Sequence, residues 1–209
     1  QAFYDEPGFQ NANPDLGGEV VDTTELVLDH RASADLHLRA SLYRWKIDDL
    51  TTYGTDEDGV GQYQAAGSVE SRGLELSATH TWRNGARLRG NVSFQHATDT
   101  AGNRVENSPR VLGRVNFSTP LPTLPLRLGM ELAYDGKRRS PSGNTVDAYW
   151  LSNLHLVADR WIPGAEVSLS VLNLFDEDYA HPSAGAPIHT MDRIAQDGRS
   201  LRLKFDYRF

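Results

Sequence analysis

The sequence predicts an all-β protein whose strands form an antiparallel, up-and-down transmembrane β-barrel. Apolar residues recur at every second position in about nine segments, which is the period of half-buried strands. Short turns and long polar connections alternate along the chain, as they do in outer-membrane barrels. Aromatic residues gather near the ends of these segments, as the girdles of such a barrel require.

Each predicted strand rests on its own alternation. Segment 23–30 is weakly alternating, whereas segment 36–43 places Leu36, Leu38, Ala40 and Leu42 on one face. The next four strands are predicted over 74–79, 87–95, 111–118 and 126–134. Segment 150–159 is again weak, and segment 166–171 carries Val167, Leu169 and Val171 on one face.

The last segment, 200–209, alternates most clearly. One face carries Leu201, Leu203, Phe205, Tyr207 and Phe209, and the other carries Arg202, Lys204, Asp206 and Arg208. A helix would scatter both sets around its circumference, so this segment is a strand.

The connections between these segments favour a membrane barrel over a β-sandwich. Four are short, over 31–34, 83–85, 119–125 and 161–165, and four are long and polar, over 48–61, 98–106, 135–147 and 174–198. Asn84-Gly85 is a tight-hairpin signal, and the prolines of 119–125 cannot continue a ladder. This strict alternation of short and long connections matches the short periplasmic turns and long extracellular loops of outer-membrane barrels.

The aromatic residues predicted to form girdles are Tyr134, Tyr149, Trp150, Trp161, Tyr207 and Phe209. Alternation alone does not decide the environment of the apolar face, because soluble antiparallel sheets share it. A soluble ligand-binding β-barrel therefore stays open as an alternative.

Composition excludes some classes of protein. The 28 acidic residues outnumber the 21 basic ones among 209, so there is no basic footprint for nucleic acid. There is no cysteine, which excludes disulfides and thiolate metal sites. No run of about 18 apolar residues occurs, so the sequence predicts no membrane-spanning helix. The opening Gln1-Ala2-Phe3 lacks a signal segment, so we expect a chain processed or excised from a longer one.

Four passages resemble one family. They are Asn13–Leu16 with Glu25–Asp29, Ser71-Arg-Gly-Leu-Glu-Leu76, Asn173-Leu-Phe-Asp-Glu-Asp-Tyr179, and the Gly198-Arg199 pair that opens a final strand ending in Phe209. In this order they resemble the C-terminal barrel portion of TonB-dependent outer-membrane receptors, and they span nearly the whole chain.

The resemblance implies a barrel of twenty-two strands, of which residues 1–209 would supply about nine as the C-terminal part of a single barrel domain. The N-terminal plug and the TonB box of that family are not in these residues. It also implies a place in the bacterial outer membrane and uptake of a small molecule, most often a ferric siderophore. The expected partners are lipid and lipopolysaccharide, the barrel-insertion machinery, and TonB acting through the plug.

The resemblance gives particular residues an expected role. Asn173 and Asp176 should cap a turn by hydrogen bonds to backbone amides, and Gly198 should let the chain turn sharply into the last strand. Phe209 resembles the signal that the insertion machinery reads. We expect deletion of Phe209 to lower barrel assembly more than a change at Asp56.

Three long loops are predicted to face substrate, over 48–61, 135–147 and 174–197. Their candidate residues are Asp56, Asp58, Lys137, Arg138, Arg139, His181 and His189. The basic triplet 137–139 is open to two interpretations, contact with an anionic siderophore or lipopolysaccharide phosphate, or solvated charge. Residues 56–58 lack the spaced ligands of an EF-hand, so we expect an acidic surface loop rather than a Ca²⁺ site.

No motif of a hydrolase, metalloprotease or phosphate-binding loop occurs, so we expect no enzyme, cofactor or resident metal. The strand carboxylates Glu75 and Glu131 are expected to form salt bridges with Arg87, Arg89, Arg114 or Arg127. A passive pore or adhesion barrel remains an alternative, in which residues 1–11 would add a tenth strand.

Overall fold

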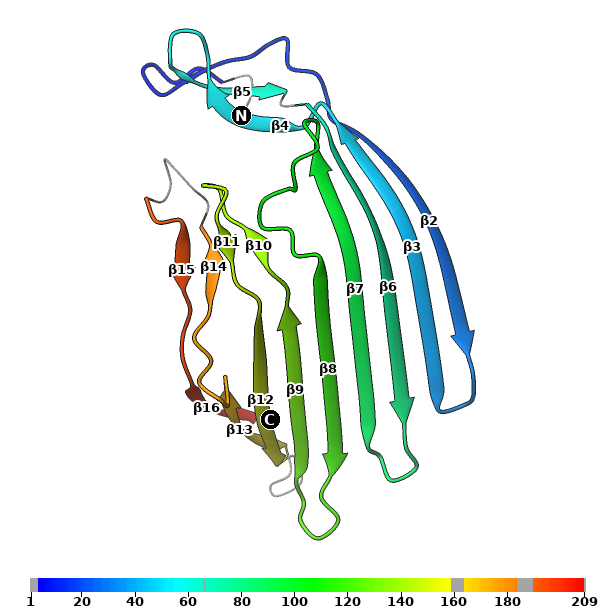
Figure 1. Ribbon diagram of the computed structural model, residues 1–209. Coiled ribbons are helices and arrows are strands. Elements are labelled where there is room, and N and C mark those ends of the chain that lie inside the picture. Colours follow the sequence, from blue (N-terminus) through cyan, green and yellow to red (C-terminus); the bar gives the residue numbers. More distant parts are fainter. Residues whose placement is uncertain (1–3, 66, 159–163, 184–189, 209) are drawn as a thin grey trace. The chain divides into compact units, whose positions relative to one another are not determined.

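A computed structural model describes residues 4–65, 67–158, 164–183 and 190–208, and within these ranges the chain is all-β without a helix (Figure 1). Nine strands form one sheet in the order β16-β13-β12-β9-β8-β7-β6-β3-β2. Their bounds are β2 (Val20–Arg31), β3 (Leu36–Asp48), β6 (Val69–Thr81), β7 (Arg87–Asp99), β8 (Val111–Pro120), β9 (Arg127–Asp135), β12 (Tyr149–Ala158), β13 (Ala165–Leu172) and β16 (Ser200–Tyr207). Each strand pairs with its neighbours along the chain, which is the predicted up-and-down topology.

The nine strands correspond one to one with the nine predicted segments. Most extend past the predicted bounds, because the alternation of apolar residues ends before the ladder does. The registers align the apolar positions into rows across the sheet. One row contains Leu88, Phe117, Met130, Leu154, Val171 and Leu201. Since directly paired residues share a face, this row defines the apolar face of β7, β8, β9, β12, β13 and β16.

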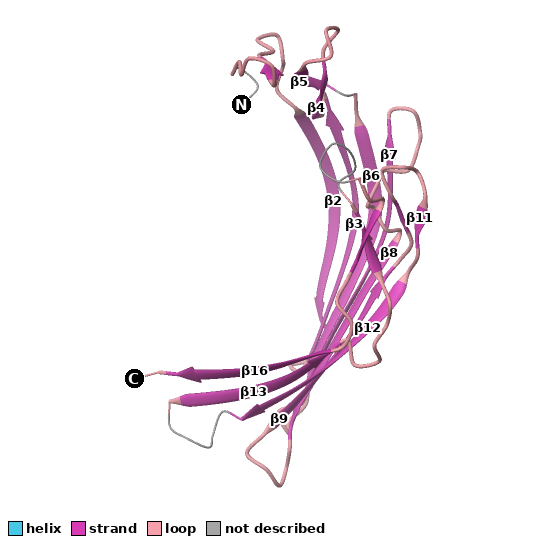
Figure 2. Ribbon diagram, turned by 90° about the vertical axis from the view of Figure 1, so that its left-hand side faces the viewer, coloured by secondary structure: helices cyan, strands magenta, loops and turns pink. Residues whose placement is uncertain are grey.

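The apolar face is exposed. Leu201, Leu203 and Phe205 are 74%, 73% and 62% exposed, and Leu132 in the interior of the sheet is 39% exposed. Leucines in a packed protein interior are almost fully buried. Figure 2 shows β9, β12, β13 and β16 as one layer. In the part of the chain that the structure describes, these leucines therefore meet no second sheet and no helix layer.

The buried residues are few and mostly small, among them Ala86, Ala97, Ala158 and Ala165. No helix that is long and apolar enough to cross a bilayer occurs among the described residues.

Short and long connections alternate as predicted. The turn after β6 is a three-residue loop, because Gly85 alone takes a positive φ (79°) and Trp82 N–H donates to Ala86 O at 2.8 Å. Asn84 contributes by accepting the Ala86 N–H on its side chain at 3.0 Å. The Asn-Gly pair therefore makes a hairpin as expected, but not through the two-residue turn with two positive φ angles.

The long loops contain short strands that the sequence did not predict. The loop after β3 contains β4 (Thr51–Thr55) and β5 (Gly61–Ala65). The next two hairpins are β10 (Arg138–Arg139) with β11 (Thr145–Val146), and β14 (Ala180–Pro182) with β15 (Arg193–Ala195). β1 (Gln10–Asn11) pairs in parallel with β5. The alternative in which residues 1–11 add a tenth barrel strand is therefore wrong.

The chain divides into two compact units. The first, called the loop unit, comprises residues 1–25, 43–72 and 96–105, and the second, called the sheet unit, comprises 26–42, 73–95 and 106–209. Assignment of 1–209 to one barrel domain stays a prediction. Each unit is described by itself below.

The aromatic girdle is only partly as predicted. Tyr134 and Trp150 are paired on the apolar face with ring centroids 4.7 Å apart, and Tyr207 is exposed. The prediction that Tyr149 belongs to the girdle is wrong, because the alternation along β12 turns its side chain to the opposite face, where it is 6% exposed. The sequence missed a cluster at the turn ends of β6 and β8, in which Trp82 contacts His80 and Phe117. Trp161 and Phe209 lie outside the described residues.

Candidate functional site: two clusters of loop residues

A buried carboxylate organises the loop ends of the sheet unit. Asp135 ends β9 with its side chain 6% exposed, and it accepts hydrogen bonds from Arg114 at 2.7 Å and from Arg138 at 2.5 Å. Arg138 also donates to Asn107 Oδ1 at 3.3 Å. Two guanidinium groups compensate one carboxylate, so this carboxylate is paired as a buried charge requires.

Three aromatic rings, those of Tyr149, Tyr179 and His181, connect Arg138 to the last long loop. The Tyr149 hydroxyl accepts a hydrogen bond from Arg138 Nη2 at 3.2 Å and lies 2.9 Å from His181 Nε2. The Tyr149 ring centroid is 4.5 Å from that of Tyr179. Burial, together with the positive charge of Arg138, lowers the pKa of His181. Burial also raises the pKa of the Tyr179 hydroxyl. His181 therefore stays neutral more readily than a free imidazole does.

Asp192 joins the two long loops of the sheet unit. One of its carboxylate oxygens accepts from Ser140 Oγ at 2.8 Å and from Asn144 Nδ2 at 3.0 Å, and the other accepts from the Ser142 amide at 3.2 Å. Ser140 is fully buried. These bonds lower the pKa of Asp192, the Ser140 and Asn144 side chains contributing most. The carboxylate thereby fixes the β10–β11 hairpin to the β14–β15 loop.

The Asn173–Tyr179 segment forms the expected capped turn. Asn173 Oδ1 accepts the Glu177 amide at 2.8 Å, and Asp176 Oδ1 accepts the Arg199 amide at 2.6 Å. Both residues take positive φ angles, 50° and 59°. The predicted caps are confirmed. Gly198 does not take a positive φ, so the expected sharp turn does not depend on a left-handed glycine. A Cβ there would lie 2.8 Å from Asp176 Oδ1, so that side chain would have to shift.

In the loop unit, Asp56 caps a turn. Its Oδ1 accepts the Asp58 amide at 3.0 Å and the Val60 amide at 2.8 Å, and its Oδ2 accepts from Asn11 Nδ2 at 2.6 Å. The Val60 amide and the Asn11 side chain are the main causes of a lowered pKa for Asp56. The Tyr53 hydroxyl donates to Phe9 O at 3.1 Å. The segment around β1 is thereby held against the β4–β5 hairpin.

The loop unit is strongly acidic. It contains thirteen Asp and Glu but only four Lys and Arg, a formal charge of −9, whereas the sheet unit carries +2. Within it, Arg44 pairs with Glu70 at 3.0 Å and Lys46 pairs with Asp48 at 2.7 Å. A field of one sign of charge attracts ligands of the other sign.

The polar face of the sheet unit carries its own contacts. Glu131 accepts from Asn153 at 3.0 Å and lies 3.4 Å from His155 Nε2, and the other nitrogen of His155 lies 2.8 Å from Ser170 Oγ. The expected salt bridge of Glu131 with an arginine is therefore wrong. The register explains the contacts, because Glu131 pairs directly with Asn153, and His155 with Ser170.

The structure brings two of the predicted site residues together, Arg138 and His181, through Tyr149. Lys137 is 64% exposed and lies 3.4 Å from Asp147, while Arg139 is half-buried in β10. Asp58 is exposed in the Asp56 turn of the loop unit. His189 lies outside the described residues. A substrate-facing role for these residues stays a prediction.

The sequence missed Asp135, Tyr149 and Asp192, because their partners are set by register and by loop folding rather than by spacing. Within the described ranges, no group of three or more His, Asp and Glu side chains is placed to hold a metal ion.

The profile of the family described as "TonB dependent receptor-like, beta-barrel" matches residues 2–174. This chain belongs to that family. The family is one of outer-membrane transport receptors and not of enzymes. The predicted family is thereby confirmed, and the match contains the passages at 13–29 and 71–76 but ends before those at 173–179 and 198–209 are complete. The single-layer sheet with an exposed apolar face is the wall expected of a receptor barrel. The polar face is accordingly the lumen face.

Solved receptor structures share the fold. The ferric-catecholate import receptor Fiu of E. coli K12 aligns with a TM-score of 0.73 and 20% identity over 94% of this chain and 29% of its own. The FrpB iron transporter of Neisseria meningitidis gives a TM-score of 0.76 and 16% identity over 97% and 33%. The copper transporter OprC gives a TM-score of 0.74 and 16% identity over 93% and 32%.

The chain thus spans about a third of the length of these structures. No curated protein matches the sequence.

Proposed function

We propose that this chain forms barrel wall and outward loops of a bacterial outer-membrane receptor that imports a small molecule, most often a ferric siderophore in this family. The observation that carries the proposal is the open single-layer sheet with exposed leucines in a chain of the receptor-barrel family. Names of two relatives, a ferric-catecholate import receptor and an iron transporter, support iron as the cargo.

In the proposed mechanism, the long loops capture the substrate and the lumen face lines its path. The loops of the sheet unit are suited to capture because Asp192 and the Asp135–Arg138 pair hold their bases in place. A pre-organised loop loses less conformational entropy on binding. Lumen residues such as Glu131, Asn153 and His155 offer hydrogen bonds along the wall. Energy would come from TonB acting on a plug domain, and the ferric complex would be substrate rather than cofactor.

Further partners follow from the same proposal. Lipid and lipopolysaccharide would surround the apolar face, and the insertion machinery would place the barrel in the outer membrane. No catalytic role is proposed for any residue.

The charge of the loop unit favours a second candidate for the substrate, a metal cation or a metal complex without net negative charge. A formal charge of −9 in the loop unit would slow the approach of an anionic chelate and speed that of a cationic one. One relative with this fold is named a copper transporter.

Uptake by cells tests the proposal. Cells carrying the complete gene should accumulate radioactive iron from a supplied siderophore under iron limitation, and cells lacking the gene should not. Accumulation should stop when the inner-membrane proton gradient is collapsed, since active import needs energy. Import that persists without the gradient would indicate a passive pore, and recovery of the protein without detergent would indicate a soluble binder.

Ionic strength separates the two substrate candidates. Raising salt screens surface charge beyond a Debye length of about 10 Å at 0.1 M. The association rate of a cationic complex should fall as salt is added, and that of an anionic chelate should rise. Substitution of Asp48, Asp49, Glu57 and Asp58 by Asn and Gln should weaken this dependence, because it lowers the formal charge of the loop unit from −9 to −5.

A further inference from the structure

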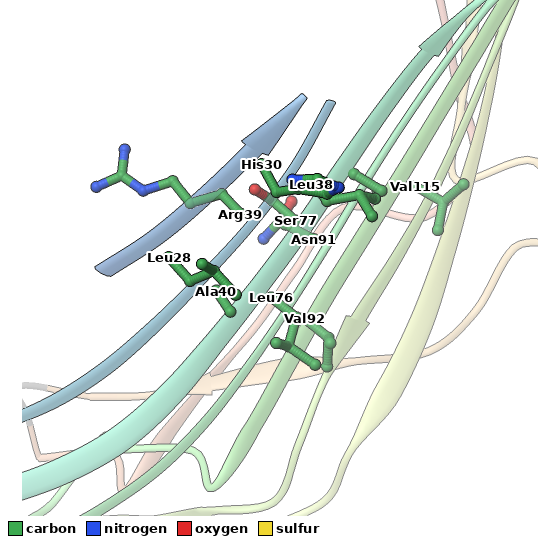
Figure 3. Close-up of a pocket in the computed structure, with 12 residues that line it drawn as sticks. Leu28, His30, Leu38, Arg39, Ala40, Leu76, Ser77, Asn91, Val92 and Val115 are labelled. Carbon is green, nitrogen blue, oxygen red and sulfur yellow. The ribbon is translucent and has the colours of Figure 1, made fainter. Parts of the chain in front are cut away.

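The sheet unit is hollowed on both of its faces. The larger hollow is a groove of about 600 Å³ on the apolar face, lined by Ala40, Ala78 and Gly90 among other residues, and Arg39 points away from its apolar side chains (Figure 3). This groove is part of the surface that lipid would cover in the proposed receptor. A second hollow, of about 220 Å³, lies on the lumen face and is lined by charged and polar side chains. The second hollow can therefore select a ligand by its charge and hydrogen bonds.

Two arginines of β7 line the hollow of the lumen face. Arg87 and Arg89 are two residues apart, so their side chains leave the same face of the strand from points about 7 Å apart. Within the described ranges, neither guanidinium group forms a hydrogen bond or an ion pair. Like charges at this spacing repel each other. An anion bound between the two arginines would relieve that repulsion.

The neighbouring strand β8 adds neutral hydrogen-bond donors. Ser118 pairs directly with Arg87, and Asn116 pairs directly with Arg89, and both polar side chains line the hollow. The Asn116 side chain has no hydrogen-bond partner in the part of the chain that the structure describes. Ser118 Oγ accepts from Arg127 at 3.1 Å, which leaves the hydroxyl proton to be donated. Each arginine thus lies beside a neutral group that can donate to the same anion.

A glycine gives the hollow its depth. Gly129 of β9 pairs with Ser118 on one side and with His155 of β12 on the other, and it lines the hollow. A Cβ at position 129 would lie 3.4 Å from His155 Cβ, on the lumen face. Glycine inside a strand often marks a place where a ligand approaches the backbone closely. A ligand group can therefore reach the backbone of β9 at this point.

The charge and size of the hollow suit a single anionic group. Glu131, the acidic residue among the described residues that line it, is bound elsewhere, since it accepts from Asn153 at 3.0 Å and lies 3.4 Å from His155 Nε2. Two arginines and one glutamate give the lining a net charge of +1 with neutral histidine. The volume of about 220 Å³ is smaller than the range of about 300–1,000 Å³ that is usual for whole ligands.

We propose that Arg87 and Arg89 bind a carboxylate group of the molecule that crosses the lumen, with Asn116 and Ser118 as further donors. This inference rests on the import function proposed above. The planar fork of N–H groups on arginine matches the two oxygens of a carboxylate. A phosphate monoester fits less well, because its charge of about −1.5 to −2 exceeds the charge of the lining.

The hollow lies near the short-turn end of the sheet, because Arg87 is the first residue of β7 after the turn that contains Gly85. In the proposed receptor this is the periplasmic end of the lumen wall, opposite the long loops. The carboxylate would therefore be bound after the molecule has left the loops that capture it.

Chemical modification of arginine tests the site. The complete receptor would be purified in detergent and treated with phenylglyoxal, which reacts with accessible guanidinium groups, and modification of each arginine would be read by mass spectrometry. We expect sodium acetate to slow the modification of Arg87 and Arg89 several-fold relative to sodium chloride at the same ionic strength. Arg83, which is exposed in the turn after β6, should react at the same rate in both salts.

Two substitutions should change this protection in opposite directions. Glu131→Gln removes the negative charge of the lining and should strengthen protection by acetate several-fold, a gain that misfolding cannot produce. Gly129→Ala places a methyl group in the hollow and should weaken protection. Gly90→Ala is the matched control and should leave protection unchanged. Gly90 pairs with Val115 on the apolar face, and a Cβ there meets no atom closer than 3.9 Å.

Equal modification rates of Arg87 and Arg89 in the two salts would overturn the proposal. So would resistance of both arginines to phenylglyoxal in either salt, because another part of the receptor would then cover them. Stronger protection by inorganic phosphate than by acetate would also overturn it. Modification is read on purified receptor and does not depend on import, so loss of import with acetate protection retained would count against the proposed function alone.

Discussion

Asn173, Asp176 and Gly198 show how single residues set the entry into the last strand. Asn173 and Asp176 take positive φ angles and accept backbone amides on their side chains. Asn and Asp are among the residues that tolerate this conformation. The carboxylate of Asp176 then occupies the space that a side chain at position 198 would need.

Gly198→Ala should destabilise the receptor by about 1 kcal/mol, the lower end of the usual cost of overpacking, because the atom it meets ends a side chain. The added Cβ would lie 2.8 Å from Asp176 Oδ1, so the bond from that oxygen to the Arg199 amide must shift. The measurement is the temperature at which the folded receptor converts to the slower-moving unfolded form on a gel. Gly18→Ala is the control, because no atom lies within 4 Å of a Cβ there. Equal midpoints for the two variants would contradict the steric role.

His181 should make the loop cluster of the sheet unit sensitive to acid. Its pKa is lowered from 6.5 in the folded protein by burial and by Arg138, so the unfolded state binds the proton more readily. The stability that neutral His181 contributes is therefore fully present above its pKa in the unfolded state, 6.5. It is lost as the pH falls through the lower pKa of His181 in the folded state.

The test is the midpoint temperature of unfolding, measured at about pH 7.5 and at about pH 5, which lie on either side of the ordinary imidazole pKa. Wild type should lose stability over this interval, and His181→Gln should lose less. A pH dependence identical in the two proteins would show that His181 is not responsible.

At the scale of elements, the long loops are built as hairpins that are joined to one another. β10–β11 and β14–β15 are each two to three residues per strand, which is too short for an independent hairpin. Bonds from Asp192 to Ser140 and Asn144 supply the missing support. We infer that the two loops order together.

Asp192→Asn should loosen the β10–β11 hairpin. One of the two oxygens of Asp192 becomes an NH₂ group, so the Ser142 amide or the Ser140 and Asn144 side chains lose their acceptor. Hydrogen exchange of the 140–146 segment should become about tenfold faster, the effect expected for one lost hydrogen bond. Asp178→Asn is the control, an exposed acidic residue of the same loop. Unchanged exchange in Asp192→Asn would show that the loops order separately.

At the scale of the whole molecule, the two faces of the sheet differ in polarity. The apolar face carries exposed Leu, Val and Phe side chains, and the lumen face carries Arg, Glu, Asn and His. A sheet of this kind leaves a large apolar area unburied by protein, and in the proposed outer-membrane receptor lipid would cover it.

Leu132→Arg should lower the yield of folded receptor in the outer membrane, because arginine near the middle of a lipid-facing strand costs about 2–4 kcal/mol. Ala133→Arg is the matched control, since residue 133 is adjacent on β9 and points to the lumen. The yield of folded Ala133→Arg receptor in the outer membrane should be close to that of the wild type. Equal membrane yields for both variants would mean that the apolar face does not contact hydrocarbon.

Local sequence determined most of the sheet. Each of the nine strands was predictable, because a period of two in apolar residues is a property of neighbouring positions. The alternation of turn lengths was predictable from Gly, Pro and polar residues. The cap at Asn173 was also predictable, since its side chain bonds to the Glu177 amide four positions away, whereas Asp176 reaches the Arg199 amide across 23 positions.

Tertiary structure alone decided the partners across strands and between loops. Asp135 lies between Arg114 and Arg138 because β8 and β9 pair in one register, and a shift of one residue would turn Asp135 to the lipid. Asp192 meets Ser140 across 52 positions of sequence, a contact that no local pattern encodes. The groove lined by Ala40, Ala78 and Gly90 likewise combines residues of three strands that are far apart in sequence. Strand formation depends on neighbours in sequence, whereas sites depend on neighbours in space.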